Sequence, residues 1–296
     1  MKKHAPLFLA IALLLCSGMT FSSCSGSSSK PSKADAAIDA DTIPVDADQY
    51  VRIETTEGNI TLRLYRDTPR HRHNFVKLVR KGYYDGQTFY RIINNSLIQA
   101  GDPASKTATK ETPLGTGDVD YTLEPELMPE KYYHKRGAIA MASYKPMLES
   151  SGGQFYIVTG YKQNDIRLNN DETHVNKKRR ELVFDSITKQ PVYQEKLKVM
   201  KQKNDKRGIW NVKEEISTRT DEVMATRKPF AFSKEQRQVY QTIGGEASLD
   251  GFYTVFGEVI EGDEVLTKIE KRAVNSDKRP LEDVRINHIV VVEKTN

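Results

Sequence analysis

The sequence predicts a mainly β fold, in which short strands form a closed or nearly closed barrel flanked by two helices. Three observations support this prediction. Short β-like segments recur along most of the chain, only two helical segments lie among them, and one long basic stretch interrupts the series. With 296 residues, the chain is long enough for one substantial domain with additional elements.

The N-terminus has the pattern of a bacterial secretion signal. Two lysines precede an apolar run at residues 7–15, which is too short to predict a membrane span. Small residues then lead to Cys24, as in a bacterial lipobox, although Phe21 stands where an aliphatic residue is usual. We therefore expect a signal peptide at residues 1–23. The alternative is an ordinary cleaved signal whose cysteines are incidental.

Lipidation of Cys24 would anchor the chain to a bacterial membrane as a lipoprotein of the cell envelope, on its periplasmic or surface side. Residues 24–49 are rich in Ser, Ala and Asp and have no apolar periodicity, so we expect a flexible tether after the lipidated cysteine. Cys16 and Cys24 are the only cysteines. No disulfide or thiolate metal site can therefore form in the rest of the chain.

The first ordered elements are predicted to be a hairpin and a helix. Residues 51–55 and 60–65 alternate in hydrophobicity around a turn near Gly58. Thr68 followed by Pro69 is typical of a helix start, and apolar residues at helical spacing continue to a glycine at position 82.

The remaining barrel segments are short and spread along the chain. A second helix is predicted at residues 263–271, before the last strand. The further predicted strands lie at residues 88–93, 97–99, 137–142, 154–158, 253–259 and 284–292.

A long insertion separates the two parts of the predicted barrel. We place the barrel at residues 50–160 and 246–296, and a basic, largely helical insertion at residues 161–245. Within the insertion, Pro191 should interrupt a helical stretch. Ser233 should cap a further helix.

Five ordered motifs resemble those of the cyclophilin-type peptidyl-prolyl cis/trans isomerases. The resemblance covers about residues 50–160 and 245–294, most of the predicted mature chain. The motifs are FYRII at 89–93, IQAGDP at 98–103, GAIAMA at 137–142, GGQFYI at 152–157 and LDGFYTVFGEV at 249–259.

The resemblance implies an eight-stranded antiparallel barrel capped by two helices, with a proline-binding groove on its outer face. It also implies isomerase (rotamase) activity on X-Pro bonds. Rotation about such a bond crosses a barrier of about 18–20 kcal/mol because resonance stiffens the amide. Because no bond is broken, we expect no nucleophile, metal ion or cofactor.

By the same resemblance, Arg91 is the catalytic arginine and Gln99 is the glutamine that orients it. A guanidinium group supplies several hydrogen-bond donors in a rigid fork. Met141 and Phe155 are expected in the barrel core. The predicted substrate-binding residues are Leu97, Ala142, Ser143, Gln154, Tyr156, Leu249 and Tyr253.

Four positions depart from the usual family pattern. Ser96 and Tyr156 stand where pocket phenylalanines are usual, Ser143 replaces a common asparagine, and Ser248 stands where animal members often have tryptophan. A missing phenylalanine removes a side chain whose burial is worth about 1.5–3 kcal/mol. We therefore expect a pocket with one reduced wall.

The expected partners are proline-containing peptides and unfolded exported proteins, together with the membrane through the lipid anchor. The formal net charge of +5 is spread among charges of both signs, and export argues against nucleic acid as a partner. The predicted function is therefore prolyl isomerisation that assists folding of exported proteins. The alternative is a chaperone or scaffold module that binds proline segments with little turnover, through the insertion.

Overall fold

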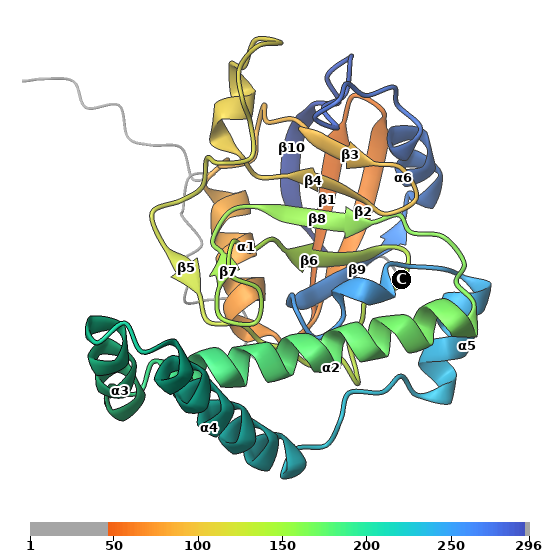
Figure 1. Cartoon of the computed structure of the whole chain (residues 1–296). Coiled ribbons are helices and arrows are strands. Elements are labelled where there is room, and N and C mark those ends of the chain that lie inside the picture. The colour runs from red at the N-terminus through yellow and green to blue at the C-terminus, as the bar shows by residue number, and fades with distance from the viewer. Residues whose placement is uncertain (1–46, 294–296) are drawn as a thin grey trace, which may run out of the picture. The chain divides into compact units, whose positions relative to one another are not determined.

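An eight-stranded antiparallel sheet forms the centre of the protein (Figure 1). The computed structural model describes residues 47–293. In sheet order the strands are β10 (Ile286–Val292), β1 (Gln49–Thr55), β2 (Gly58–Leu64), β9 (Val255–Glu261), β6 (Ala138–Met141), β8 (Phe155–Val158), β4 (Leu97–Ala100) and β3 (Arg91–Ile93).

The two edges of this sheet meet, so the sheet closes into a barrel. The segment before β3 pairs with the beginning of β10: the Gly86 amide donates to the Ile286 carbonyl at 2.8 Å, and the Phe89 amide donates to the Val284 carbonyl at 2.9 Å. The predicted barrel is confirmed.

Alternating side chains of the strands fill the barrel interior. Phe75, Phe155 and Phe256 meet there, with Phe75 and Phe155 edge to face at a centroid distance of 5.3 Å. Met141 and Phe155 are fully buried in this core, as the sequence predicts. The two capping helices, α1 (Pro69–Arg80) and α6 (Asp263–Glu270), lie at opposite ends of the barrel (Figure 1).

Helix α1 begins where the sequence predicts, but Thr68 does not cap it with its side chain. The Glu126 carboxylate does so instead, because it accepts the backbone N–H groups of Arg70 at 3.1 Å and His71 at 3.0 Å. A carboxylate at this end also matches the positive pole of the helix. The helix start is therefore held by a residue distant in sequence.

The insertion consists of four helices, and two of them pack on the barrel. Apolar side chains of the insertion and of the barrel loop at 247–252 form one buried cluster. Its members are Leu168, Val175, Phe230, Phe232, Tyr240, Ala247 and Phe252. The helices are α2 (Asp165–Thr188), α3 (Pro191–Gln202), α4 (Lys206–Ala225) and α5 (Lys234–Thr242).

A second cluster holds α3 and α4 against the C-terminal half of α2 (Figure 1). Pro191 begins α3 after α2 has ended at Thr188, and Ser233 caps α5 with Gln236 in a capping box, so both sequence predictions are confirmed. The cluster comprises Val183, Ile187, Leu197, Val212 and Ile216.

Short elements complete the fold. The strands β5 (Thr122–Leu123) and β7 (Ser150–Ser151) pair with each other, and two single 3-10 turns are η2 (Pro103–Lys106) and η3 (Ala247–Leu249). No helix within residues 47–293 is long and apolar enough to cross a membrane. The predicted signal peptide, Cys24 and residues 24–46 of the predicted tether lie outside the described residues.

Candidate active site

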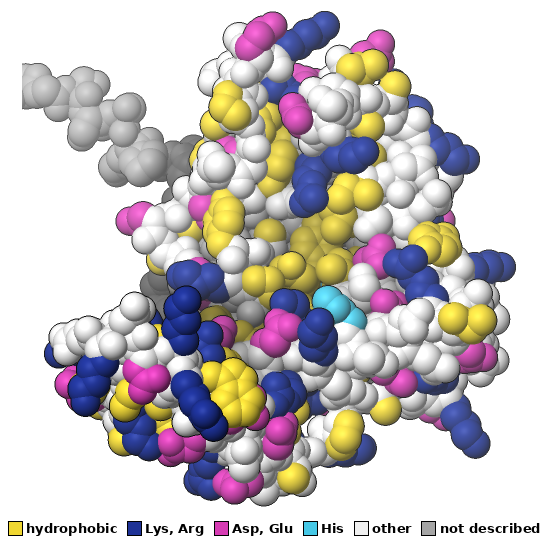
Figure 2. Space-filling model, viewed as in Figure 1, with side chains coloured by type: hydrophobic (Ala, Val, Ile, Leu, Met, Phe, Trp, Pro, Cys, Tyr) yellow, Lys and Arg dark blue, Asp and Glu magenta, His cyan; other side chains and the backbone are white. Residues whose placement is uncertain are grey.

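A separate apolar cluster lies on the outer face of the barrel, distinct from the interior core and from the clusters of the insertion. It underlies a hollow of about 350 Å³, called here the aromatic hollow. Figure 2 shows apolar side chains gathered in a hollow between the barrel and α2. Eight of the nine residues predicted for catalysis or substrate binding line the aromatic hollow: Arg91, Leu97, Gln99, Ala142, Ser143, Tyr156, Leu249 and Tyr253.

Two tyrosines set the shape of the aromatic hollow. Tyr156 lies on β8, and Tyr253 lies in the loop before β9. Their rings are 5.8 Å apart and nearly perpendicular, at 87°. This edge-to-face packing is a favoured geometry for aromatic pairs and holds both rings in place.

The polar side of the hollow is a row of hydrogen-bonded side chains. The register of β3 and β4 places Arg91 opposite Gln99, and the Arg91 guanidinium donates to Gln99 Oε1 at 3.2 Å. Gln99 Nε2 in turn donates to Gln154 Oε1 at 3.2 Å. The exposed arginine is therefore oriented by a buried glutamine.

Gln154 lies in a neighbouring hollow of about 530 Å³, called here the glutamine hollow. Arg91, Gln99, Ala142 and Ser143 line both hollows. The Gln154 side chain accepts the Tyr90 hydroxyl at 2.6 Å and donates to the carbonyl oxygen at position 117 at 2.6 Å. The structure therefore places Gln154 behind Gln99, and not at the wall of the aromatic hollow.

The Tyr156 hydroxyl points away from the hollow and into a buried network. It lies 2.8 Å from His134 Nε2, and His134 Nδ1 lies 2.7 Å from Asp250 Oδ1. The other carboxylate oxygen of Asp250 accepts the hydroxyl of Tyr240 in α5 at 2.6 Å. Since Nδ1 donates to the carboxylate, Nε2 accepts a hydrogen bond from the Tyr156 hydroxyl.

The sequence matches one family model over most of its length. The model, described as "Cyclophilin type peptidyl-prolyl cis-trans isomerase/CLD", matches residues 50–213 and 187–291. The chain belongs to the cyclophilin-type peptidyl-prolyl cis-trans isomerases.

Curated relatives support the same assignment. A Staphylococcus haemolyticus protein, provisionally named a peptidyl-prolyl cis-trans isomerase, is 28% identical over 246 residues, which are 82% of this chain and 91% of the relative. A Helicobacter pylori peptidyl-prolyl cis-trans isomerase is 35% identical over 109 residues, which are 36% of this chain and 61% of the relative. The enzyme class is therefore peptidyl-prolyl cis-trans isomerase.

The fold is also that of solved cyclophilins. A Cryptosporidium parvum cyclophilin-type isomerase matches with a TM-score of 0.51 and 20% identity, covering 84% of this chain and all of the other. The same protein, solved in the presence of the dipeptide Ala-Pro, matches with a TM-score of 0.50 and 20% identity, covering 83% of this chain.

The walls of the aromatic hollow include two uncharged phenols, Tyr156 and Tyr253. Burial raises the pKa of Tyr156 well above its usual value, and it raises the pKa of Tyr253, an effect that the positive charge of Arg91 partly offsets. Both hydroxyls therefore stay protonated at neutral pH. Arg91 is the cationic side chain among the residues that line the aromatic hollow.

Two further lining residues were not predicted from the sequence. Ile93 lines the aromatic hollow beside Ser96. It lies two residues after Arg91 on β3, and alternation along a strand places both on one face, so this signal was present in the sequence. Ile93 supplies apolar surface on the side where Ser96 replaces the usual phenylalanine.

Glu246 is the other unpredicted residue, and it is buried at the edge of the hollow. Arg167 of α2 pairs with it at 3.3 Å, and the Ser248 hydroxyl donates to it at 2.6 Å. No local sequence pattern connects these residues, because Arg167 belongs to the insertion. The insertion therefore contributes directly to the charge balance beside the hollow.

Ser143 uses its hydroxyl within its own loop. That hydroxyl contacts the Glu149 carbonyl and accepts the Lys145 amide at 2.9 Å. Its backbone, and not its side chain, is thus left to face a ligand. Within residues 47–293, no group of three or more His, Cys, Asp and Glu side chains could hold a metal ion.

Proposed function

We propose that this chain isomerises X-Pro bonds in exported polypeptides, with Arg91 as the catalytic residue and the aromatic hollow as the proline site. The observation that carries the proposal is the Arg91–Gln99 hydrogen bond at the rim of an apolar hollow. A single hydrogen-bond donor, held beside a pocket that fits a small apolar ring, meets the needs of the reaction.

The reaction requires stabilisation of a twisted amide. During rotation the proline nitrogen loses conjugation and regains a lone pair, which can accept a hydrogen bond that the planar ground state cannot. Arg91 donates to that nitrogen, and Gln99 fixes the guanidinium so that little reorganisation is needed. Leu97, Tyr156 and Tyr253 exclude water around the ring.

Two observations support proline-containing peptides as the substrates. The glutamine and aromatic hollows share four lining residues, so an extended peptide can pass from one to the other with its backbone along Ala142 and Ser143. The Cryptosporidium parvum protein of the same fold was solved in the presence of Ala-Pro.

Exchange spectroscopy by NMR tests this proposal on a short X-Pro peptide. The full chain should accelerate cis/trans exchange, and Arg91→Ala should lower kcat/KM on the order of 10²-fold, the usual cost of removing one such donor. Arg219→Ala, which breaks an exposed ion pair on α4, is the matched control. Exchange no faster than that of the peptide alone, with folded protein, would refute the proposal.

We also propose that the enzyme works at the bacterial envelope, where it assists folding of exported proteins. The support is the lipobox-like sequence pattern that ends at Cys24. A cysteine lipidated there would carry several acyl chains, and multiple acyl chains anchor a protein stably in a membrane. Uncatalysed prolyl isomerisation takes tens to hundreds of seconds and can limit folding. Cys24→Ser should abolish incorporation of labelled fatty acid and release the chain from membranes, whereas Cys16→Ser should not. Labelling that persists in Cys24→Ser would contradict the anchor.

A further inference from the structure

The aromatic hollow also adjoins a further hollow of about 550 Å³, called here the flank hollow. Ser248, Leu249 and Tyr253 line both, so the two are adjacent. The flank hollow lies between the barrel loops and α2, and Leu182 and Phe252 contribute apolar surface to it. One wall of this hollow is therefore built by the insertion.

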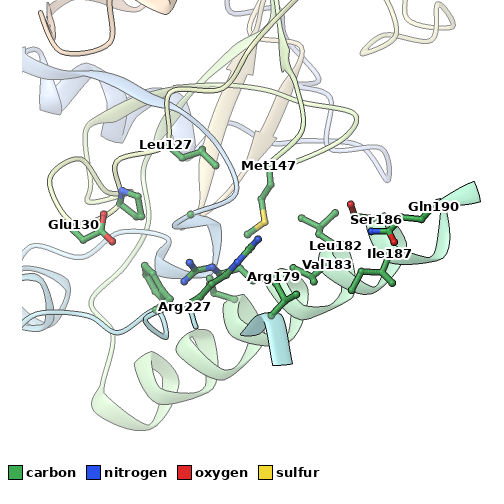
Figure 3. Close-up of a pocket in the computed structure, with 15 residues that line it drawn as sticks. Leu127, Glu130, Met147, Arg179, Leu182, Val183, Ser186, Ile187, Gln190 and Arg227 are labelled. Carbon is green, nitrogen blue, oxygen red and sulfur yellow. The ribbon is translucent and has the colours of Figure 1, made fainter. Parts of the chain in front are cut away.

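Another hollow of about 610 Å³, called here the arm groove, adjoins the flank hollow. Met147 and Leu182 line both of them. Leu127 and Met147 approach the groove from the barrel, whereas the apolar side chains of α2 line its other side (Figure 3). The aromatic hollow, the flank hollow and the arm groove thus adjoin one another in a series, called here the path, that ends beside helices α2 and α4 of the insertion.

Met147, at the junction of the last two hollows, has a backbone φ of 67°. A residue other than glycine rarely adopts this conformation, and strained positions of this kind gather at functional sites. The Met147 amide donates to the Phe252 carbonyl at 2.9 Å, which holds the strained turn. A methionine side chain can adapt to apolar groups of different shapes.

The charges along the path differ between its two parts. In the flank hollow, Lys178 pairs with Glu181 at 2.6 Å. In the arm groove, Arg179 and Arg227 form no ion pair with a carboxylate of residues 47–293, and Glu130 is the one acidic lining residue. The arm groove therefore presents two unneutralised cations beside an apolar wall.

We propose that the flank hollow and the arm groove bind the polypeptide that flanks the substrate proline. An aliphatic or aromatic side chain a few residues from the proline enters the flank hollow, and an acidic side chain farther along pairs with Arg179 and Arg227. An extended chain advances about 3.3 Å per residue, so a side chain a few residues from the proline lies on the order of 10 Å from it. This inference rests on the proposed function, because the aromatic hollow defines the position of the proline.

The test compares short and long peptides with the full chain. The short peptide has one residue on each side of the X-Pro pair. The long peptides carry a leucine at each position from two to five residues before or after the proline, with a glutamate farther out. NMR exchange gives kcat/KM, and fluorescence anisotropy gives Kd independently of turnover.

At least one leucine placement should raise kcat/KM and lower Kd about tenfold relative to the short peptide, the effect of burying one leucine side chain. Leu182→Asp should remove this advantage and leave the short peptide unaffected within twofold. The milder Leu182→Ser should act in the same direction. Ile166→Asp is the matched control, because Ile166 is on the same helix, 73% exposed and outside all three hollows.

A charge swap tests the arm groove separately. Arg227→Glu should weaken binding of the glutamate peptide several-fold and restore it for the same peptide with lysine in place of glutamate. Lys177→Glu, an exposed change on α2 outside the groove, should alter neither.

The outcomes separate this inference from the proposed function. Equal Kd and kcat/KM for short and long peptides, or equal losses for both in Leu182→Asp, would overturn the extended path while leaving the isomerase intact. No acceleration of any peptide would overturn the proposed function. A long-peptide Kd that still depends on Leu182 would in that case support the path as a binding site.

Discussion

At the scale of single residues, Tyr156 has two roles: its ring lines the aromatic hollow, and its hydroxyl is hydrogen-bonded to His134 inside the protein. The motif predicts Tyr156 at the floor of the hollow, and the structure places it there. The sequence gives no reason for tyrosine in place of phenylalanine. That reason is the hydroxyl's contact with His134, which lies on a distant segment and is buried with Asp250.

Tyr156→Phe should therefore reduce stability more than activity. The change leaves His134 Nε2 buried without a partner, which costs about 1–3 kcal/mol in the free energy of unfolding. Because the ring and the wall remain, kcat/KM for a short X-Pro peptide should fall less than about threefold. Chemical denaturation and NMR exchange measure the two quantities. A large loss of activity at unchanged stability would mean that the hydroxyl acts on the substrate.

At the scale of elements, the barrel strands and α5 were predictable, whereas α2 was not. The strands alternate in hydrophobicity, and Ser233 gives α5 a local start signal. Helix α2 buries Leu168 and Val175 against the barrel but Val183 and Ile187 against α3 and α4. Since its two halves have different partners, it has no single apolar stripe along its length.

The docking of α2 also buries an acidic side chain. Asp171 is nearly buried, its Oδ2 atom has no hydrogen-bond partner, and burial raises the pKa of its carboxyl to about 6. The positive charge of Arg167, whose Nε lies 3.9 Å from Asp171 Oδ2, partly offsets this rise in the pKa. Between about pH 4 and pH 6, the folded state thus keeps a proton on Asp171 that the unfolded chain has already lost.

The stability contribution of Asp171 should consequently decrease as pH rises through that window. Asp171→Asn removes the titration, so the stability of the variant relative to wild type should increase from pH 4 to pH 7, by on the order of 1–3 kcal/mol. Denaturant unfolding at several pH values measures this difference. A difference that does not vary with pH would contradict the account of Asp171.

At the scale of the whole molecule, the insertion has two parts with different roles. Its proximal part, with Val175, Phe232 and Tyr240, is built into the barrel surface and the network behind Tyr156. Its distal part, α3 and α4, contacts the rest through the second half of α2. The sequence predicts the insertion from its composition, but it cannot separate the two parts because the contacts that distinguish them are long-range.

Deletion of residues 182–226, with Glu181 joined to Arg227 by a short glycine linker, tests this division. The Arg179 side chain already contacts the Lys228 carbonyl at 3.4 Å, so the two ends of the cut lie near each other. Turnover of a short X-Pro peptide should stay within twofold of the full chain, since no deleted residue lines the aromatic hollow. Loss of that turnover in a folded variant would show that the distal part of the insertion supports the catalytic site itself.

We propose that an oriented guanidinium, and not merely a positive charge, carries the catalysis. Arg91→Lys tests it most directly, because lysine keeps the charge but lacks the planar fork that Gln99 holds. The measurement is kcat/KM for cis/trans exchange of one short X-Pro peptide, compared among wild type, Arg91→Lys and Arg91→Ala. We predict that Arg91→Lys loses activity on the order of 10²-fold, close to Arg91→Ala. Activity of Arg91→Lys near that of wild type would contradict the account.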